Sequence, residues 1–188
     1  MSELQARSAR RLATLTISDA GSKGERQDTS GPAISEVMTE LGYVEIDRVL
    51  VPDEADQISR QLAAWCDGGE VDIVLTTGGT GLSPRDVTPE ATRSVIEYEI
   101  PGIPEAIRTQ TAASTRMAML SRAVAGIRSG CLVINLPGSP TGVREALAVI
   151  GPVIGHAIDI ARDRPGQSGH GDHTDHDSQS DHSGHKSL

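Results

Sequence analysis

The stretch Ile73–Thr92, IVLTTGGTGLSPRDVTPEAT, decides the fold. It begins with an apolar and β-branched run typical of a buried strand, turns through the glycine-rich segment Gly78–Gly81, and reaches a helix start at Thr88. α/β proteins form anion sites where a strand ends in a glycine turn before a helix, because backbone N–H groups and the positive helix end attract negative charge. The stretch therefore predicts an α/β fold with a phosphate-binding loop.

The glycines alone leave a second interpretation open, since Gly-Gly-x-Gly after a strand is often only a tight turn. The loop lacks the lysine of the common phosphate loop and the spacing of the dinucleotide-binding fingerprint. Asp86, shortly after the glycines, adds a distinct feature. A carboxylate beside a phosphate cradle repels the phosphate unless a cation bridges the two. We expect that cation to be Mg²⁺, which prefers oxygen ligands.

Strand and helix patterns alternate on both sides of this stretch. They predict a three-layer α/β/α sandwich with a mostly parallel sheet plus a β-hairpin. The predicted strands are Leu12–Ser18, Tyr43–Val51 and Asp72–Thr77, followed by the hairpin strands Arg122–Arg128 and Cys131–Leu136. The predicted helices are one with Ser30 as its N-cap, then Glu54–Cys66, Thr88–Tyr98, Pro101–Ala113 and Thr141–Arg162, the last kinked or divided by Pro152. Residues 20–29 are predicted to form a loop.

Four predicted strands end in polar or glycine-rich segments. These exits are Ser18-Asp19, Pro52-Asp53, Thr77–Asp86 and Asn135–Pro140. Because the carboxyl ends of parallel strands meet at one edge of a sheet, all four exits face a single crevice if their strands are parallel. This convergence predicts an active site there.

Composition excludes several classes of partner. Aromatic residues make up 2% of the 188 residues and the formal net charge is −9. A nucleic-acid surface needs a basic face and stacking aromatics, so we expect no nucleic-acid partner. No run approaches the roughly 20 apolar residues of a membrane span, and we expect no membrane contact. The lone Cys66 and Cys131 suit a reducing compartment, so the expected location is cytoplasmic.

The two ends of the chain differ from the rest. Residues 1–11 are predicted to be a flexible basic arm, residues 12–164 the folded domain, and residues 165–188 a disordered tail rich in His and Asp. The tail histidines either chelate Ni²⁺, Cu²⁺ or Zn²⁺ weakly or belong to a segment that only aids solubility.

Two aspartates are the main candidates for chemistry. Asp53 follows a strand and precedes a helix, which suits an N-cap as well as a functional role. Asp86 also has a capping alternative, although Thr88 is better placed for it. Two carboxylates from separate strand exits near glycine amides suit a Mg²⁺-nucleotide site. Arg85 is either a phosphate clamp or a solvated surface charge.

Other candidates are less specific. Asn135–Pro140 is either a simple turn or a segment that presents backbone amides and Ser139 to a phosphate or a base. Ser121 and Arg122 lie at the start of the hairpin, where an arginine is a surface residue or a group that binds an anionic substrate. His156 lies among apolar helix residues and is expected to be a packing residue.

The motifs together resemble the molybdopterin adenylyltransferase family of molybdenum cofactor biosynthesis, the MogA/MoaB type. The resemblance extends from about Leu12 to Ile160, and it does not include the tail. Besides TTGGTG and PRDVTPEAT, it rests on TISD at Thr16–Asp19, SGPA at Ser30–Ala33, VPDE at Val51–Glu54, PGIPEAIR at Pro101–Arg108, AMLSR at Ala118–Arg122, AGIR at Ala125–Arg128 and NLPGSP at Asn135–Pro140.

The resemblance implies a nucleotidyltransferase that uses Mg²⁺ and ATP to convert molybdopterin into adenylyl-molybdopterin and pyrophosphate. It also implies a homotrimer and, as a partner, a molybdenum-insertion enzyme. The alternative is a molybdopterin-binding or scaffold protein of the same fold that does not turn over ATP. Carried over by position, the implied roles are catalysis and Mg²⁺ binding for Asp53 and Asp86; nucleotide and phosphate binding for Gly78, Gly79, Thr80, Gly81, Asn135, Pro137, Gly138 and Ser139; and pterin binding for Ser18, Asp19, Ser121 and Arg122.

Overall fold

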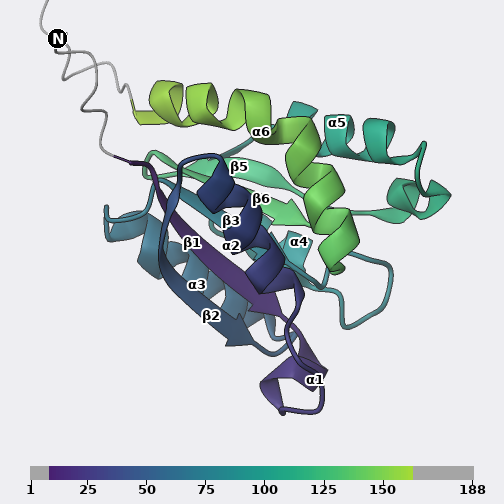
Figure 1. Ribbon diagram of the computed structural model, residues 1–188. Coiled ribbons are helices and arrows are strands. Elements are labelled where there is room, and N and C mark those ends of the chain that lie inside the picture. The colour runs from purple at the N-terminus through teal and green to yellow at the C-terminus, as the bar shows by residue number, and fades with distance from the viewer. Residues whose placement is uncertain (1–8, 163–188) are drawn as a thin grey trace, which may run out of the picture.

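A computed structural model of the protein describes residues 9–162, which form a six-stranded sheet between two layers of helices (Figure 1). The strands lie in the order β2-β1-β3-β6-β5-β4. Their bounds are β1 Arg11–Ile17, β2 Val44–Val51, β3 Ile73–Thr77, β4 Tyr98–Glu99, β5 Ala125–Arg128 and β6 Cys131–Leu136. The helices are α1 Asp19–Ser22, α2 Ser30–Glu40, α3 Ala55–Asp67, α4 Thr88–Arg93, α5 Gly102–Thr111, the 3₁₀ helix η1 Arg116–Leu120, and α6 Pro140–Arg162.

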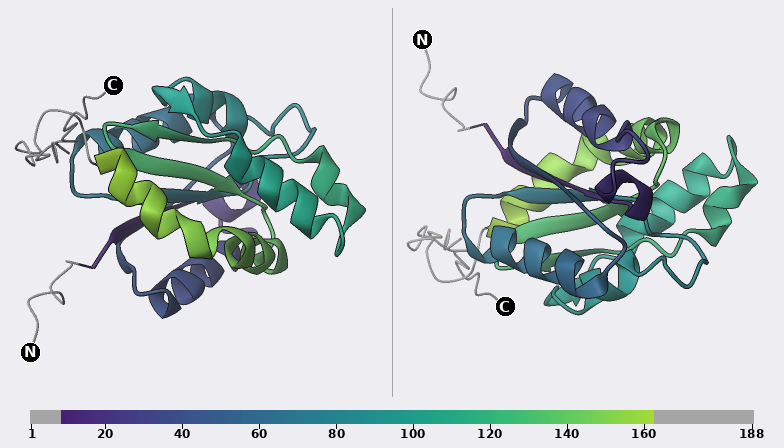
Figure 2. Two further views of the ribbon diagram at one scale, coloured as in Figure 1. Left: turned by 90° about the horizontal axis from the view of Figure 1, so that it is seen from above. Right: turned by 90° about the horizontal axis from the view of Figure 1, so that it is seen from below.

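The hydrophobic core has two parts, one on each face of the sheet. On one face α2, α5 and α6 cover alternate residues of the central strands, including Leu75 and Ile134. On the other face α3 and α4 cover the intervening residues, including Val74 and Val133. Figure 2 shows α2 and α3 on opposite sides of the sheet. The central strands β3 and β6 are buried on both faces and contain the apolar runs Ile73–Leu75 and Cys131–Ile134, and the predicted three-layer sandwich is confirmed.

The sheet is mostly parallel, as predicted. β1 pairs in parallel with β2 and β3, and β3 pairs in parallel with β6. β5 runs antiparallel to β6, which confirms the hairpin, and its turn residues Ser129 and Gly130 have φ of 50° and 77°. The two-residue strand β4 adds an antiparallel edge that the sequence did not predict.

Several element bounds differ from the predictions. The predicted loop at residues 20–29 contains helix α1, which begins because the Ser18 hydroxyl accepts a hydrogen bond from the Gly21 N–H at 3.0 Å. Ser30 is not the N-cap of α2 but its first residue, and Asp28 satisfies the free N–H groups of Ser30 and Gly31, each at 3.0 Å. Side-chain capping in each case comes from a residue just upstream of the helix.

Other helices end or bend differently from the predictions. α4 ends at Arg93 rather than Tyr98, because Tyr98 pairs with β5 in the added edge strand. Pro152 does not divide α6, which remains one helix, and Figure 1 shows the helix changing direction along its length. None of the helices within residues 9–162 combines the length and apolar composition needed to cross a bilayer. The predicted tail at 165–188 lies outside the described residues.

Candidate active site

The four parallel strands end at one edge of the sheet, and two cavities open there. The first, of about 360 Å³, is lined by Thr16, Ile17, Ser18, Gly21, Arg26, Gln27, Asp28, Thr29, Ser30, Leu50, Asp53, Thr77, Gly78, Gly79, Asp86, Gly138, Ser139 and Pro140. The second, of about 580 Å³, is lined by Gly79, Thr80, Gly81, Leu82, Asp86, Thr111, Thr115, Met117, Ala118, Leu120, Ser121, Pro137, Gly138, Ser139, Gly142 and Glu145.

The two cavities have a wall in common. Four residues line both of them: Gly79, Asp86, Gly138 and Ser139. We call these four residues the shared wall. The first cavity lies over α1 and the start of α2, whereas the second lies between η1 and the start of α6. Two ligands can therefore approach the shared wall from different sides.

The glycines are required by close backbone packing. Gly78 has φ of 98°, and a Cβ there would lie 2.2 Å from the Ile17 carbonyl oxygen. Gly79 has φ of 63°, and its Cβ would lie 2.4 Å from the Thr88 hydroxyl oxygen and 3.1 Å from Asp53 Oδ1. A side chain at either position is therefore excluded, and the backbone of the loop stays accessible at the site.

Hydroxyl groups fix the loops around these glycines. Thr88 Oγ1 donates to the Gly78 carbonyl at 2.9 Å, and Thr77 Oγ1 donates to the Pro137 carbonyl at 2.6 Å. Ser30 Oγ donates to the Gly138 carbonyl at 3.0 Å. These bonds join the ends of β3 and β6 to the start of α2, so the shared wall is held from several directions.

Asp53 lies half-buried at the end of β2, on the first cavity. Its Oδ2 accepts the Asp19 N–H at 2.8 Å, and its own N–H donates to Asp19 Oδ1 at 3.1 Å. Burial raises the pKa of the Asp53 carboxyl above its ordinary value, and the negative charges of Asp19 and Asp86 raise it further. Asp53 is thus a carboxylate that a bound cation would stabilise.

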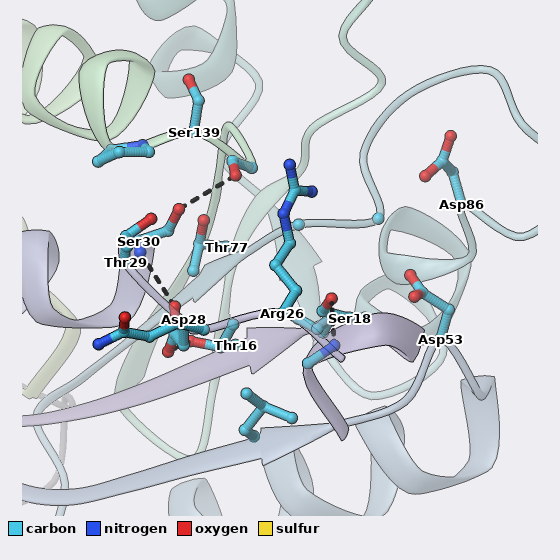
Figure 3. Close-up of a pocket in the computed structure, with 18 residues that line it drawn as sticks. Thr16, Ser18, Arg26, Asp28, Thr29, Ser30, Asp53, Thr77, Asp86 and Ser139 are labelled. Atoms are coloured by element: carbon cyan, nitrogen blue, oxygen red, sulfur yellow. Dashed lines mark hydrogen bonds between the residues drawn. The ribbon is translucent and has the colours of Figure 1, made fainter. Parts of the chain in front are cut away.

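Asp86 lies on the shared wall, and its Oδ2 accepts the Ser83 N–H at 2.7 Å. Figure 3 shows Asp86 and Asp53 on the right of the first cavity, with the side chain of Arg26 in this view between them and the segment Asp28–Ser30. Within residues 9–162 neither aspartate forms an ion pair. The two carboxylates from separate strand exits therefore meet without a protein cation bound to either.

The described residues contain no group of three or more His, Cys, Asp and Glu side chains suited to a metal ion. Two carboxylates are nevertheless sufficient for Mg²⁺, which binds through one or two of them and takes its other ligands from water and substrate phosphates. The donor set at Asp53 and Asp86 fits that ion: hard oxygen ligands, partly buried and mutually repelling.

Arg85 does not reach the cavities. Its guanidinium pairs with the Asp19 carboxylate at 2.9 Å and with Glu54 at 3.0 Å. The bond from Arg85 lowers the pKa of Asp19 below its ordinary value. Of the two interpretations of Arg85, the geometry favours an arginine that links α1 to the loop after β2. Asp19 therefore contacts Asp53 and Arg85, and it does not line either cavity.

Arg122 supports the loop that contains Asp86. Its backbone N–H donates to the Thr80 carbonyl at 2.9 Å, and its Nε donates to the Gly81 carbonyl at 2.7 Å. The remaining guanidinium nitrogens bind the Asp86 carbonyl and the Glu90 carboxylate. The structure therefore places Arg122 behind the loop, whereas its neighbour Ser121 lines the second cavity.

Asn135 is fully buried and does not line either cavity. Its amide donates to the hydroxyls of Thr76 and Thr92 at 3.0 and 2.9 Å, and its carbonyl accepts the Val124 N–H at 3.1 Å. Through these bonds the Asn135 side chain holds β6 against β3, α4 and the residue that precedes β5. The nearby Pro137, Gly138 and Ser139 do line the second cavity, and Ser139 Oγ accepts the Gly142 N–H at 3.1 Å at the start of α6.

Part of each cavity is formed by residues that the sequence did not indicate. In the first, Arg26 and Asp28 come from the segment predicted to be a loop. In the second, Leu82, Met117 and Glu145 form walls that no motif indicated. A signal existed only for Asp28, which precedes the SGPA motif at the start of α2. Ser18, grouped by resemblance with Ser121, lines the first cavity instead of the second.

Residues 13–156 match a family described as the probable molybdopterin binding domain. The chain is 43% identical over 151 residues to a molybdopterin adenylyltransferase of Helicobacter pylori, covering 79% of this chain and 86% of that protein. It is 39% identical over 154 residues to a molybdopterin adenylyltransferase of Escherichia coli K12, covering 79% of each.

Solved structures agree with this match. The molybdopterin biosynthesis enzyme MoaB of Thermus thermophilus superposes with a TM-score of 0.78 at 47% identity, covering 83% of this chain and 98% of that one. The tungsten cofactor synthesizing protein MoaB of Pyrococcus furiosus superposes with a TM-score of 0.75 at 34% identity, covering 84% and 100%. With its sheet, glycine loop and paired cavities, this chain belongs to the molybdopterin-binding domain family that includes the MogA and MoaB proteins.

Proposed function

We propose that the protein is a molybdopterin adenylyltransferase, which uses Mg²⁺ and ATP to form adenylyl-molybdopterin and pyrophosphate in molybdenum cofactor biosynthesis. The observation that carries the proposal is the shared wall: two cavities meet at Gly79, Asp86, Gly138 and Ser139. A transfer between two substrates needs two binding sites that meet at the reacting atoms. The names of the H. pylori and E. coli relatives support the same activity.

The first cavity is proposed to hold the nucleotide. Its polar lining includes the Gly78–Gly79 backbone, the hydroxyls of Thr77 and Ser30, and the guanidinium of Arg26. Backbone amides and a cation suit a triphosphate. The second cavity, with its apolar walls and Ser121, is proposed to hold the pterin.

Asp53 and Asp86 are proposed to hold Mg²⁺, which would neutralise charge on the triphosphate and orient it. Their side chains lie at the first cavity, and Asp86 also reaches the second, so they lie where the two substrates meet. Burial, followed by the negative charges of Asp19 and Asp86, raises the pKa of Asp53, and a bound cation would offset that repulsion and favour the carboxylate.

In the proposed reaction, a terminal phosphate oxygen of molybdopterin forms a bond to the α-phosphorus of ATP. The bond from the α-phosphorus to the bridging oxygen breaks, and pyrophosphate leaves with that electron pair. The attacking phosphate is already ionised, so no side chain needs to remove a proton. The protein's contribution is to position both phosphates at the shared wall and to neutralise their charge.

The test is an assay of the purified protein with molybdopterin, Mg²⁺ and ATP, which follows adenylylated pterin and pyrophosphate. Product that requires Mg²⁺ and is lost in Asp86→Asn supports both the enzyme and the metal site. Tight pterin binding without product would instead indicate a binding or scaffold protein. The absence of both would refute the proposal.

Assembly and location remain predictions from the family resemblance. We propose a homotrimer in the cytoplasm that passes its product to a molybdenum-insertion enzyme. Analytical ultracentrifugation checks the trimer, since a monomeric mass at micromolar concentration would contradict it.

A further inference from the structure

The second cavity contains a carboxylate that has no partner in the described part of the chain. Glu145 lies half-buried on the second turn of α6 and faces the cavity. Within residues 9–162 its side chain makes no hydrogen bond or ion pair. The neighbouring Arg144 does not neutralise it, because the Arg144 guanidinium pairs with Glu36 at 2.5 Å. Glu145 is thus free to accept hydrogen bonds from a ligand.

The walls around this carboxylate are mainly apolar. Leu82, Met117 and Leu120 are 64%, 66% and 45% exposed, and all three line the cavity. The chain has no Phe, and its single Trp and two Tyr residues lie elsewhere. A planar ring in this cavity would therefore contact aliphatic side chains and the Met117 thioether, which makes favourable contacts with aromatic rings.

The position of Glu145 relative to the reacting groups is fixed by the helix. Gly142, one turn earlier on α6, lines the same cavity and donates its N–H to Ser139 Oγ at 3.1 Å. Ser139 belongs to the shared wall. Because a helix is rigid over one turn, the backbone of Glu145 has a set position with respect to that wall, and its side chain extends into the same cavity.

The chemistry of a carboxylate selects among the ligands that fit such a cavity. A pterin presents two adjacent donors at its pyrimidine edge, the N3–H and the 2-amino group, and a carboxylate accepts both with its two oxygens. Adenine presents one amino donor beside the N1 lone pair, which a carboxylate repels. An unpaired carboxylate with apolar walls therefore favours a pterin over an adenine.

We propose that Glu145 is the specificity-determining residue that recognises the 2-amino-4-oxopyrimidine edge of the pterin, and so reserves the second cavity for it. The proposal rests on the proposed function for the identity of the two substrates. It adds a residue and a mechanism of discrimination: the same carboxylate that binds the pterin edge excludes the adenine ring from this side of the shared wall.

The test compares two ring systems in the absence of ATP and Mg²⁺. Pterin is compared with lumazine, in which a carbonyl replaces the 2-amino group, by fluorescence titration of the full-length protein. We expect the wild type to prefer pterin by roughly 10- to 100-fold, the range for a hydrogen-bonded charged group. In Glu145→Gln the preference should collapse or reverse, because the carboxamide offers one acceptor for N3–H and one donor for the new carbonyl.

Glu40→Gln is the matched control, because Glu40 is an exposed glutamate of α2 that lines neither cavity and, within residues 9–162, forms no ion pair, so its loss leaves the Arg144–Glu36 pair beside Glu145 intact. It should keep the preference of the wild type. Thermal unfolding should show that both variants fold. A wild type without a preference, or a Glu145→Gln variant with an unchanged one, would overturn the proposal.

These outcomes are separate from those of the adenylylation assay. If the wild type forms product and Glu145→Gln keeps the ring preference of the wild type, the role of Glu145 is refuted and the enzyme proposal stays intact. A wild type that forms no product, while its ring preference still depends on Glu145, supports pterin recognition and refutes catalysis.

Discussion

Carboxylates at the two ends of the parallel strands are in opposite electrostatic situations. At the amino end, Asp72 is buried, accepts the Arg11 N–H at 2.6 Å, and forms ion pairs with the guanidinium groups of Arg11 and Arg162. At the carboxyl end, Asp53 and Asp86 are half-buried near each other, and neither has an ion-pair partner within residues 9–162. The missing countercharge, rather than burial, distinguishes a carboxylate suited to binding from a structural one.

The largest expected effect tests the carboxyl end. Asp86→Asn should lower the adenylylation rate by about 10²–10³-fold, the scale lost with one electrostatic transition-state contact. Steady-state assays with the pterin substrate measure the rate, and circular dichroism should show an intact fold. A rate within a few-fold of the wild type would remove Asp86 from the metal site.

The next prediction tests the amino end. Asp72→Asn should lower the free energy of unfolding by about 1–3 kcal/mol, because it breaks a buried ion pair whose arginines remain partly exposed to water. Urea unfolding measures the loss. At temperatures well below the unfolding midpoint, the adenylylation rate should stay within about twofold of the wild type, since activity tracks the folded fraction. A large rate loss in the folded variant would mean that the two ends are coupled.

A smaller effect is expected from the cation of the first cavity. Arg26 lines that cavity, and in the described residues its guanidinium makes no hydrogen bond or ion pair, so it is available to a phosphate. Arg26→Gln should weaken ATP binding by about tenfold, whereas AMP, with fewer phosphate charges, should be affected less. Calorimetry measures both affinities. Lys23→Gln is the control, because Lys23 belongs to the same segment but lines neither cavity; an equal loss in both variants would indicate only long-range attraction.

The smallest effect concerns pH. The pKa of Asp53 is raised by burial and then by its negative neighbours, so its ionised form, the one that would bind Mg²⁺ under the proposal, is lost as pH falls through a pKa above the ordinary value of 3.8. Asp86→Asn removes one negative charge and should move this pKa downward, by less than about one unit. A carboxyl NMR titration of Asp53 measures the shift. An upward shift would contradict the assigned cause.

The parts of the fold that sequence predicts well are set by local pattern. The strand before Gly78, the turn at Ser129-Gly130 and the helices with apolar periodicity follow from propensity and spacing within a few residues. The convergence of the strand exits follows from the parallel sheet. Asp53 and Asp86 could therefore be placed at one crevice from the sequence.

The parts that sequence did not predict depend on partners far along the chain. Arg122 binds Gly81, 41 residues away, and Arg85 binds Asp19, 66 residues away. Whether an arginine faces a ligand or a carboxylate is decided by such contacts, and no local pattern encodes them. The same reason explains Asn135, whose partners Thr76 and Thr92 lie on other elements, and Glu145, which appears in the sequence only as one charge on a long helix.

The direction of β5 determines which residues form the second cavity. The residues that follow a parallel strand lie at the crevice. For the antiparallel strand β5, the residues that precede it lie there instead. Ser121 and the 3₁₀ helix η1 come just before β5, and they line the second cavity for that reason. The single antiparallel strand thus places a segment that precedes it beside the segments that follow the parallel strands, and this gives the crevice its second cavity.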